Sequence, residues 1–250
     1  MAHPYHQNQY SHFSVPLIGR LLGMRGNAVL NETLAEYILK NTKNFHSIIE
    51  IGAGPGALSR LLITRFQHYI ILDKSAFALD VSRRLSPDIK PIYADIFDFY
   101  TREKFDAVLS VDLAEHFQER ELHRLINKHI EIARDDGSVF ICVRAYNPHD
   151  DGPVAMPLSA PQESSWNPRC EFKIAAWLKG HSIPFQRKYF DTIPVERKRD
   201  RAVRTVNILL YHFFKINLER FYPNDKGRMA MFFIDKSQLN SSYYFDQNYY

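Results

Sequence analysis

Short apolar runs alternate with amphipathic segments along residues 48–143. In the amphipathic segments, apolar residues recur every three or four positions, which is the period of a helix with one buried face. The runs lie at residues 48–51, 69–73, 92–95, 105–111 and 137–143. Uninterrupted apolar runs are typical of strands that are buried on both faces. The alternation therefore predicts an α/β fold, with a parallel sheet that helices cover on both faces.

The same spacing predicts a helix at Leu58, Leu61 and Leu62 and four longer helices. The first begins at Asn31, a favourable N-cap, and leads into the run at 48–51. The second spans residues 117–134, the third spans residues 169–179, and the fourth lies within residues 194–224. The apolar sides of the first, second and fourth helices are, in turn, Leu34, Ala35, Ile38 and Leu39; Leu122, Leu125, Ile126, His129, Ile130 and Ala133; and Val203, Val206, Ile208, Leu209, Leu210 and Phe213.

Changes in composition divide the chain into one domain with two insertions and two flanking segments. The N-terminal segment is too rich in aromatic residues for a disordered tail, so we interpret it as a cover or lid. One insertion is a long proline-containing loop, and loops of this length usually serve a function. The divisions are a cover at 1–30, a domain at 31–236, an inserted loop at 144–168, an inserted helix at 194–224, and a polar, aromatic tail at 237–250.

A glycine-rich loop joins the first strand to a helix. Gly52, Gly54 and Gly56 alternate there, and glycine permits positive φ and close approach of a ligand to the backbone. Gly52, Gly54 and Ala57 fit the fingerprint of dinucleotide-binding proteins. Asp73 follows the first glycine by 73 − 52 = 21 residues, where that fingerprint has its ribose-binding acid. A glycine string alone leaves two cofactor classes open.

Three further features favour a cofactor other than a dinucleotide. Pro55 removes one backbone N–H from the loop, which suits a ligand without a pyrophosphate. Glu50 stands near the carboxyl end of a buried strand, where a charge needs a hydrogen-bonding or charged partner. The runs at 69–73, 92–95 and 105–111 each place a polar residue at the carboxyl end of a strand.

With these motifs in this order, residues 31–143 resemble the class I S-adenosylmethionine (SAM) dependent methyltransferases. The resemblance implies a SAM-dependent methyltransferase enzyme with SAM as its cofactor. It also implies a Rossmann-like seven-stranded, mostly parallel sheet with an antiparallel last strand and helices on both faces. The last two strands are then residues 185–193 and 228–235.

The resemblance also assigns cofactor contacts. In that family the glycine loop packs against the methionine part of SAM, an acid after the second strand binds the ribose, and an acid after the third strand binds adenine. Carried over, these are Gly52, Ala53, Gly54 and Gly56 for methionine, Asp73 for ribose, and Asp95 with Ala94 and Ile96 for adenine. We also place Glu50, Lys74, Val111 and Asp112 at the cofactor. Residues 109–116 resemble the family segment that passes the cofactor and ends in Glu-His, although the family often has a small or apolar residue where Asp112 stands.

Several of these residues also have a purely structural interpretation. Asp73 could simply end a strand, and Asp95 could cap a turn before Phe97. His116 could tie the start of a helix to a neighbouring loop. Both interpretations stay open on the sequence alone.

Methyl transfer from SAM asks little of side chains. The methyl group leaves a sulfonium, so positioning of the acceptor and exclusion of water can do most of the work. A general base is needed only where the nucleophile starts protonated. The candidate bases are His149, our first choice because its loop should border the methyl group, then Glu115, His116, Asp150 and Asp151. We expect no metal.

Composition fits a cytoplasmic enzyme of one domain. A chain of 250 residues with 45% hydrophobic and 24% charged residues can bury a core without disulfides. The two cysteines, Cys142 and Cys170, are far apart and lack a partner motif. No leader pattern opens the chain and no apolar run has the length of a membrane span, so we expect no membrane partner.

The acceptor is the open question. Residues 110–113 lack the signature of nucleic-acid adenine methyltransferases, which argues against N6-adenine methylation. Basic residues at 187–204 stand beside Tyr189 and Phe190 and could track a phosphate backbone. We therefore favour a small-molecule acceptor with an oxygen, nitrogen or carbon nucleophile. The alternatives are RNA methylation through the basic patch and SAM binding without methyl transfer; the oligomeric state does not follow from the sequence.

Overall fold

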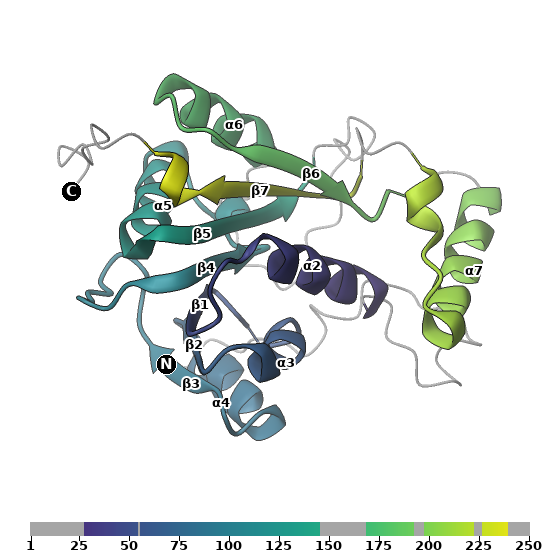
Figure 1. Ribbon diagram of the computed structural model, residues 1–250, viewed down its shortest axis with the longest axis horizontal. Helices are drawn as coiled ribbons and strands as arrows, with labels where there is room; N and C mark the ends of the chain where they lie inside the picture. The colour runs from purple at the N-terminus through teal and green to yellow at the C-terminus, as the bar shows by residue number, and fades with distance from the viewer. Residues whose placement is uncertain (1–27, 55, 146–168, 193–197, 223–226, 240–250) are drawn as a thin grey trace.

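The computed structural model describes residues 28–54, 56–145, 169–192, 198–222 and 227–239 (Figure 1). Seven strands in these ranges form one sheet in the order β3-β2-β1-β4-β5-β7-β6. They are β1 (Ser47–Ile51), β2 (His68–Asp73), β3 (Lys90–Tyr93), β4 (Phe105–Val111), β5 (Ala133–Arg144), β6 (Gln186–Phe190) and β7 (Met229–Asp235). β7 pairs antiparallel with β5 and β6, and the other neighbouring pairs are parallel. The predicted mostly parallel, seven-stranded sheet is confirmed.

Helices cover both faces of this sheet, as the sequence predicts. The core on one face is built with α5 and α6, and the core on the other face with α2, α3 and α4. The helices are α2 (Ala28–Asn41), α3 (Ser59–Leu62), α4 (Ala76–Leu85), α5 (Glu119–Ile132), α6 (Cys170–Gly180) and α7 (Lys198–Phe214). Four 3-10 turns accompany them: η2 (Ile63–Arg65), η3 (Ala114–His116), η5 (Leu218–Phe221) and η6 (Lys236–Gln238). None of these described helices has the length and hydropathy needed to cross a bilayer.

The direction of the strands defines two edges of the sheet. The carboxyl ends of β1, β4, β5 and β6 point toward the side where α7 lies in Figure 1, and α2 begins on that side. β7 runs the opposite way and ends beside η6 at the amino edge. The motifs that the sequence analysis singled out follow the carboxyl ends of β1 to β4, so they meet at one edge.

The first helix begins earlier than predicted. α2 starts at Ala28, so Asn31 lies inside the helix and the assignment of Asn31 as its N-cap is wrong. Leu30 packs against the same core as Leu34 and Ile38. The apolar face therefore extends one turn before Asn31, and packing against the sheet keeps that turn helical.

The second predicted helix ends two residues early, because the chain turns directly into a strand. Ala133 is the first residue of β5 and pairs with Phe105, so its place on the helix face is wrong. His129 is fully buried on that face, as predicted. Its Nδ1 donates to the Leu125 carbonyl at 2.8 Å, which leaves Nε2 to accept from the Ser110 hydroxyl at 2.9 Å. Burial lowers the pKa of His129 to about 4, so this imidazole is neutral and structural.

The inserted helix α7 turns the opposite way from its predicted orientation. Val206 and Phe213, placed on its apolar side, are 46% and 58% exposed. Asn207 and Tyr211 are buried instead. The Asn207 side chain accepts a backbone N–H bond at 2.6 Å, and the Tyr211 hydroxyl donates to Glu36 Oε1 at 3.2 Å. The hydrogen bonds of Asn207 to η5 and of Tyr211 to α2 therefore favour the inward orientation of this face of α7.

The sheet has two outer strands, β3 and β6. β3 is four residues long and contains Pro91. β6 carries Arg187 and Lys188 and is shorter than the predicted run at 185–193. Neither outer strand offers a long apolar edge.

Candidate functional site

The strand order reverses between β1 and β4. From β1 the chain moves outward to β2 and β3, then crosses to β4 and moves outward to β5. The crevice beyond the carboxyl ends at such a reversal is where open α/β sheets bind ligands. Gly52 follows β1, and Leu113 follows β4. A Cβ atom on Gly52 would lie 2.8 Å from the Leu113 side chain, so only glycine lets the two loops approach this closely.

The glycine loop adopts the backbone that its sequence predicts. Gly52, Gly54 and Gly56 have φ of +68°, +53° and +71°, a region that residues with a Cβ atom rarely adopt. The Gly52 N–H donates to the Leu72 carbonyl at 2.7 Å, which ties the loop to β2. The Ser82 hydroxyl donates to the Gly54 carbonyl at 2.9 Å, which ties the loop to α4. The helix after the loop, α3, is only four residues long and continues as η2.

Asp73 joins the glycine loop to the end of β2. Its Oδ2 accepts from the Gly54 N–H at 2.8 Å, and its Oδ1 accepts from the Ser75 N–H at 2.8 Å. The side chain is almost fully buried. Each carboxylate oxygen has a second lone pair, so this geometry leaves two acceptors for ribose hydroxyls. Asp73 thus holds the loop in place and stands where the predicted ribose contact requires an acid.

Glu50 lies beneath the loop and has the hydrogen-bonding partners that the sequence predicts. Its Oε2 accepts from the Ser59 hydroxyl at 2.6 Å and from the Tyr69 hydroxyl at 2.8 Å. Burial raises the pKa of Glu50 to about 7. These bonds link β1, β2 and α3. A contact of Glu50 with the cofactor stays a prediction.

The residues after β3 form a turn beside Asp73. The Ala94 N–H donates to the Asp73 carbonyl at 3.3 Å. Asp95 Oδ1 accepts from the Phe97 N–H at 2.9 Å, which is the turn cap that the sequence left open. Ile96 is buried in the core. A cap of this kind fixes the orientation of the carboxylate, and adenine binding by Asp95 stays a prediction.

Beyond β4 the chain turns sharply at Asp112. Its φ is +53°, and its N–H donates to the Cys142 carbonyl at 3.0 Å. Arg144 Nε lies 3.7 Å from Asp112 Oδ1, and both side chains are about half exposed. Arg144, placed in the inserted loop by the sequence, is the last residue of β5. Val111, the last residue of β4, packs against the core below.

Glu115 is a buried acid at the same corner. Its Oε1 accepts from the Arg144 N–H at 3.4 Å. Its Oε2 has no hydrogen-bond partner among the described residues. Burial, followed by the nearby charge of Asp112, raises the pKa of Glu115 to about 8. Near neutral pH this carboxyl group therefore holds its proton in part.

His116 is a second titratable group at this corner. Its side chain is open to solvent on one side, and desolvation by the surrounding protein lowers its pKa. The positive charges of Arg144 and Lys74 act in the same direction, and Asp112 opposes them. A lowered pKa leaves a neutral imidazole near pH 7, which can accept a proton.

Sequence and structure differ in which residues they bring to this site. His149, Asp150 and Asp151, which the sequence proposes as bases, lie outside the described residues, as does Pro55. Leu113 and Arg144 were not predicted, because their roles depend on how the loops after β4 and β5 meet. Within the described ranges, no group of three His, Cys, Asp or Glu side chains could hold a metal ion.

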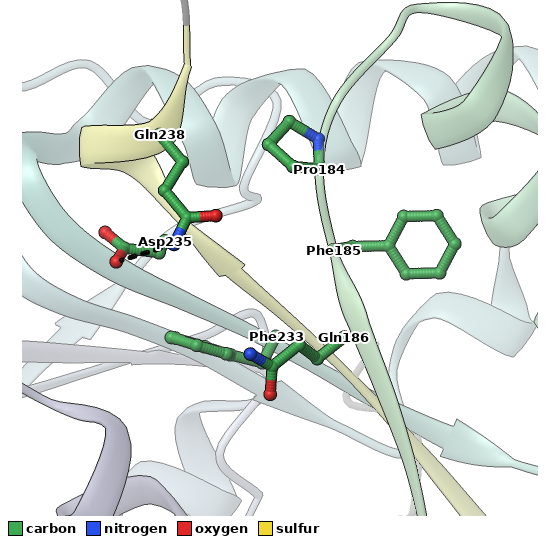
Figure 2. A pocket seen from close by; sticks show the side chains of 6 residues that line it. All are labelled: Pro184, Phe185, Gln186, Phe233, Asp235 and Gln238. Carbon is green, nitrogen blue, oxygen red and sulfur yellow. Dashed lines mark hydrogen bonds between the residues drawn. The ribbon is translucent and has the colours of Figure 1, made fainter.

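A surface hollow lies at the other edge of the sheet. Its lining residues are Pro184, Phe185, Gln186, Phe233, Asp235 and Gln238. Figure 2 shows that the Phe185 ring points away from the hollow and that Gln238 approaches Asp235, to which it donates at 3.4 Å. Asp235 ends β7 at the amino edge, so the hollow is remote from every motif residue and we assign it no function.

A family model described as a methyltransferase domain matches residues 48–137, from β1 into β5. The central part of the chain is therefore similar to methyltransferase domains. The predicted cofactor of such a domain is SAM. Three left-handed glycines, Asp73 and the turn at Asp95 line the carboxyl edge where the family binds it, so the described residues fit the cofactor.

Two solved structures share the fold of this chain. The plantazolicin methyltransferase BpumL in complex with a triazolic desmethylPZN analog and SAH aligns over 91% of this chain and 88% of its own, with 15% identity and a TM-score of 0.54. A second BpumL structure, in complex with SAH, aligns over 82% and 81%, with 13% identity and a TM-score of 0.53. Likeness at such identity shows the fold alone.

Other solved relatives are matched over less of their length. The N-methyltransferase NodS from Bradyrhizobium japonicum, in complex with S-adenosyl-L-homocysteine, has 16% identity and a TM-score of 0.42. The alignment covers 46% of this chain and 62% of NodS. No curated protein matches the sequence.

The dual role of Asp73 makes a prediction for the Asp73→Ala variant. The methyltransferase domain should lose two hydrogen bonds to a charged acceptor, each contributing about 1.5–3 kcal/mol at most. We expect the free energy of unfolding to fall, by up to about 6 kcal/mol for the two bonds together, in denaturant titrations. SAM affinity, measured by calorimetry, should fall about tenfold or more. The exposed neighbour Asp98 supplies the control, Asp98→Ala, and unchanged SAM binding in Asp73→Ala would show that this acid does not contact the ribose.

The raised pKa of Glu115 makes a prediction for pH dependence. Between the ordinary value of 4.5 and about 8, the folded protein holds a proton that the unfolded chain has released. Glu115 therefore lowers the stability of the folded state progressively as the pH rises through this window. The Glu115→Gln variant cannot titrate, so its stability relative to the natural protein should improve from pH 5 to pH 8. Parallel curves in urea titrations would contradict this, and the exposed Glu103→Gln serves as control.

Proposed function

We propose that this chain transfers a methyl group from SAM to a small-molecule acceptor at the crevice between β1 and β4. The proposal rests on two sets of residues, one after β1 and β2 and one after β4, that meet where the order of the strands reverses. The glycine loop and Asp73 form the cofactor side. Asp112, Glu115 and His116 follow β4 on the other side, where the methyl group would face its acceptor.

Each side chain has a definite task in this proposal. SAM supplies a methyl group on a cationic sulfur, which any well-placed nucleophile can attack. Asp73 holds the ribose, and the glycine loop holds the methionine part. His116, kept neutral by desolvation, accepts a proton from an acceptor that arrives protonated. Arg144 holds Asp112, and its backbone N–H holds Glu115, so both acids keep a fixed position beside the acceptor.

The described members of the basic patch give little support to an RNA acceptor. Arg187 donates to the buried Glu171 at 3.0 Å. Arg204 is ion-paired with the buried Asp191. Arginines that neutralise buried acids inside the protein have less charge to offer a phosphate backbone. We therefore keep RNA as an outcome of the test and not as a second proposal.

The test of the function follows a labelled methyl group. Full-length protein is incubated with methyl-labelled SAM and, in separate reactions, a small-metabolite extract and total RNA. We expect label in the metabolite fraction and, by calorimetry, binding of SAM but not of NAD. Label in the RNA fraction would favour the basic patch. Label in neither fraction, with SAM still bound, would identify a SAM-binding protein without methyl transfer.

The role of His116 makes a separate kinetic prediction. Replacement by Asn keeps a polar side chain but removes the group that accepts the proton. We expect kcat to fall by about 10²-fold or more, the usual contribution of a general base, with SAM affinity nearly unchanged. The kcat of the variant should rise at higher pH, because there the acceptor loses its proton without a general base. A kcat equal to that of the natural protein would show that His116 has a structural role only. The exposed His46→Asn, at the amino edge, is the control.

A further inference from the structure

The inserted helix at 194–224 is largely described by the structure, whereas most of the predicted cover, inserted loop and tail lie outside the described residues. It contains α7 and η5, which we call the α7–η5 unit. Figure 1 shows this unit beyond the end of β6 and the start of β7, at the carboxyl edge of the sheet. No described residue of the unit belongs to either apolar core of the sheet. Polar contacts therefore carry much of its attachment.

Asp191 stands at the centre of these polar contacts. It directly follows β6 and is almost fully buried. Its Oδ2 accepts from the guanidinium groups of Arg204, on α7, and of Arg228, which precedes β7, the second at 3.2 Å. The backbone of Asp191 has a φ of +56°, in a region that aspartate adopts more readily than most residues. One buried carboxylate therefore joins the end of β6 to α7 and to the start of β7.

Glu219 of η5 brings a second acid to the same place. Its Oε2 accepts from the Asp191 N–H at 3.1 Å, and its backbone carbonyl accepts from the Thr192 hydroxyl at 3.5 Å. The Asn207 side chain of α7 accepts from the Leu218 N–H at 2.6 Å, which ties η5 to α7. The two parts of the α7–η5 unit are therefore bonded to each other, and both are bonded to the residues that follow β6.

The charged residues around Glu219 lie on four segments of the chain. They are Lys188 on β6 and Asp191 after it, Arg204 of α7, Arg228 before β7, and Glu36 and Lys40 of α2, which interact with Lys188.

Their balance leaves Glu219 poorly compensated. Burial raises the pKa of Glu219 to about 7, and the charge of Asp191 adds to this effect. Backbone hydrogen bonds from Asp191 and Thr192 and the charge of Arg204 act in the opposite direction. Because Arg204 and Arg228 already bond to Asp191, they balance a second buried carboxylate only in part.

We propose that Asp191, Glu219, Arg204 and Arg228 form a latch that loosens the α7–η5 unit from the end of β6 as the pH rises. While Glu219 holds a proton, the two arginines neutralise Asp191 and the unit stays attached. Once Glu219 loses that proton, two buried carboxylates share the same positive charge, and release of η5 into water relieves their repulsion. This latch does not depend on the identity of the methyl acceptor.

The direction of the pH effect follows from the two states of Glu219. In the released unit the carboxyl group faces water and has its ordinary pKa of 4.5, whereas in the attached unit the pKa is about 7. Between these values the attached form holds a proton that the released form has lost. Attachment therefore weakens progressively as the pH rises through this window, and it changes no further above it.

Hydrogen exchange in the full-length protein tests the latch. After correction for the intrinsic pH dependence of amide exchange, the protection of the α7 and η5 amides should fall on the order of 50-fold between pH 5 and pH 8. In the Glu219→Gln variant the amide oxygen can still accept from the Asp191 N–H but the side chain cannot titrate, so this fall should be largely lost. The exposed Glu103→Gln is the matched control and should keep the response of the natural protein.

A second variant tests the electrostatic link without altering Glu219. Arg204 attracts the ionised Glu219, so its removal in Arg204→Gln raises the pKa of that acid further. The pH at which α7 and η5 lose protection should therefore move upward in this variant. An unchanged midpoint overturns the link between the two residues.

Two further outcomes overturn the proposal. Protection of α7 and η5 that stays constant from pH 5 to pH 8 in the natural protein means that no latch titrates there. An equal fall in the natural protein and in Glu219→Gln means that another group controls the attachment. None of these measurements uses methyl transfer, so failure here is distinct from failure of the proposed function.

Discussion

The Asp73 carboxylate connects the end of β2 to the glycine loop, and the rest of the site depends on that connection. Three glycines with positive φ cannot hold a loop by themselves, because glycine loses more conformational entropy on folding than any other residue. A bond from the Gly54 N–H to the buried Asp73 carboxylate supplies part of the missing constraint, and the Ser75 N–H fixes the orientation of that carboxylate. The loop then stands close enough to Leu113 for the elements after β1 and β4 to form one crevice. The side chain predicted to bind the ribose is therefore also one of the groups that hold the loop in place.

Buried acids recur around this crevice. Glu50 supports the glycine loop from below, and Glu115 stands at the corner after β4. Burial raises the pKa of both, to about 7 and about 8, so each lowers the stability of the folded state as the pH rises through its window. A protein with apolar residues at these positions would avoid that cost. Retaining ionisable groups in such positions is typical of sites that bind charged or polar ligands.

The positions of the central strands and of the glycine loop could be predicted because both are encoded locally. A buried parallel strand needs an apolar run, and a left-handed turn needs glycine, whatever surrounds them. Asp73 could be placed for the same reason, since it follows its strand directly. The hydrogen bond that it accepts from Gly54 could not be predicted, because it depends on how far the loop folds back over β2.

The orientation of α7 and the position of Arg144 show where sequence patterns fail. Amphipathicity identifies an apolar side of a helix but not the surface that the helix meets, and in α7 the hydrogen bonds of Asn207 and Tyr211 outweigh it. Arg144 follows a long apolar run, and the number of residues that stay paired there depends on the partner strand β7. Asn31 was misplaced as a cap because tertiary packing extends α2 by a turn. In each case a contact between distant segments decided the outcome.

The outer strands of the sheet affect how the protein behaves in concentrated solution. An unpaired strand presents N–H and C=O groups to which another chain can add a strand of its own. Pro91 removes one donor from β3, and that strand is too short to support a long ladder. On β6, Arg187 and Lys188 bring positive charge to the other edge. Two identical chains would repel each other at β6 and find few partners at β3, so the sheet resists growth by edge-to-edge stacking even though most of its strands are strongly apolar.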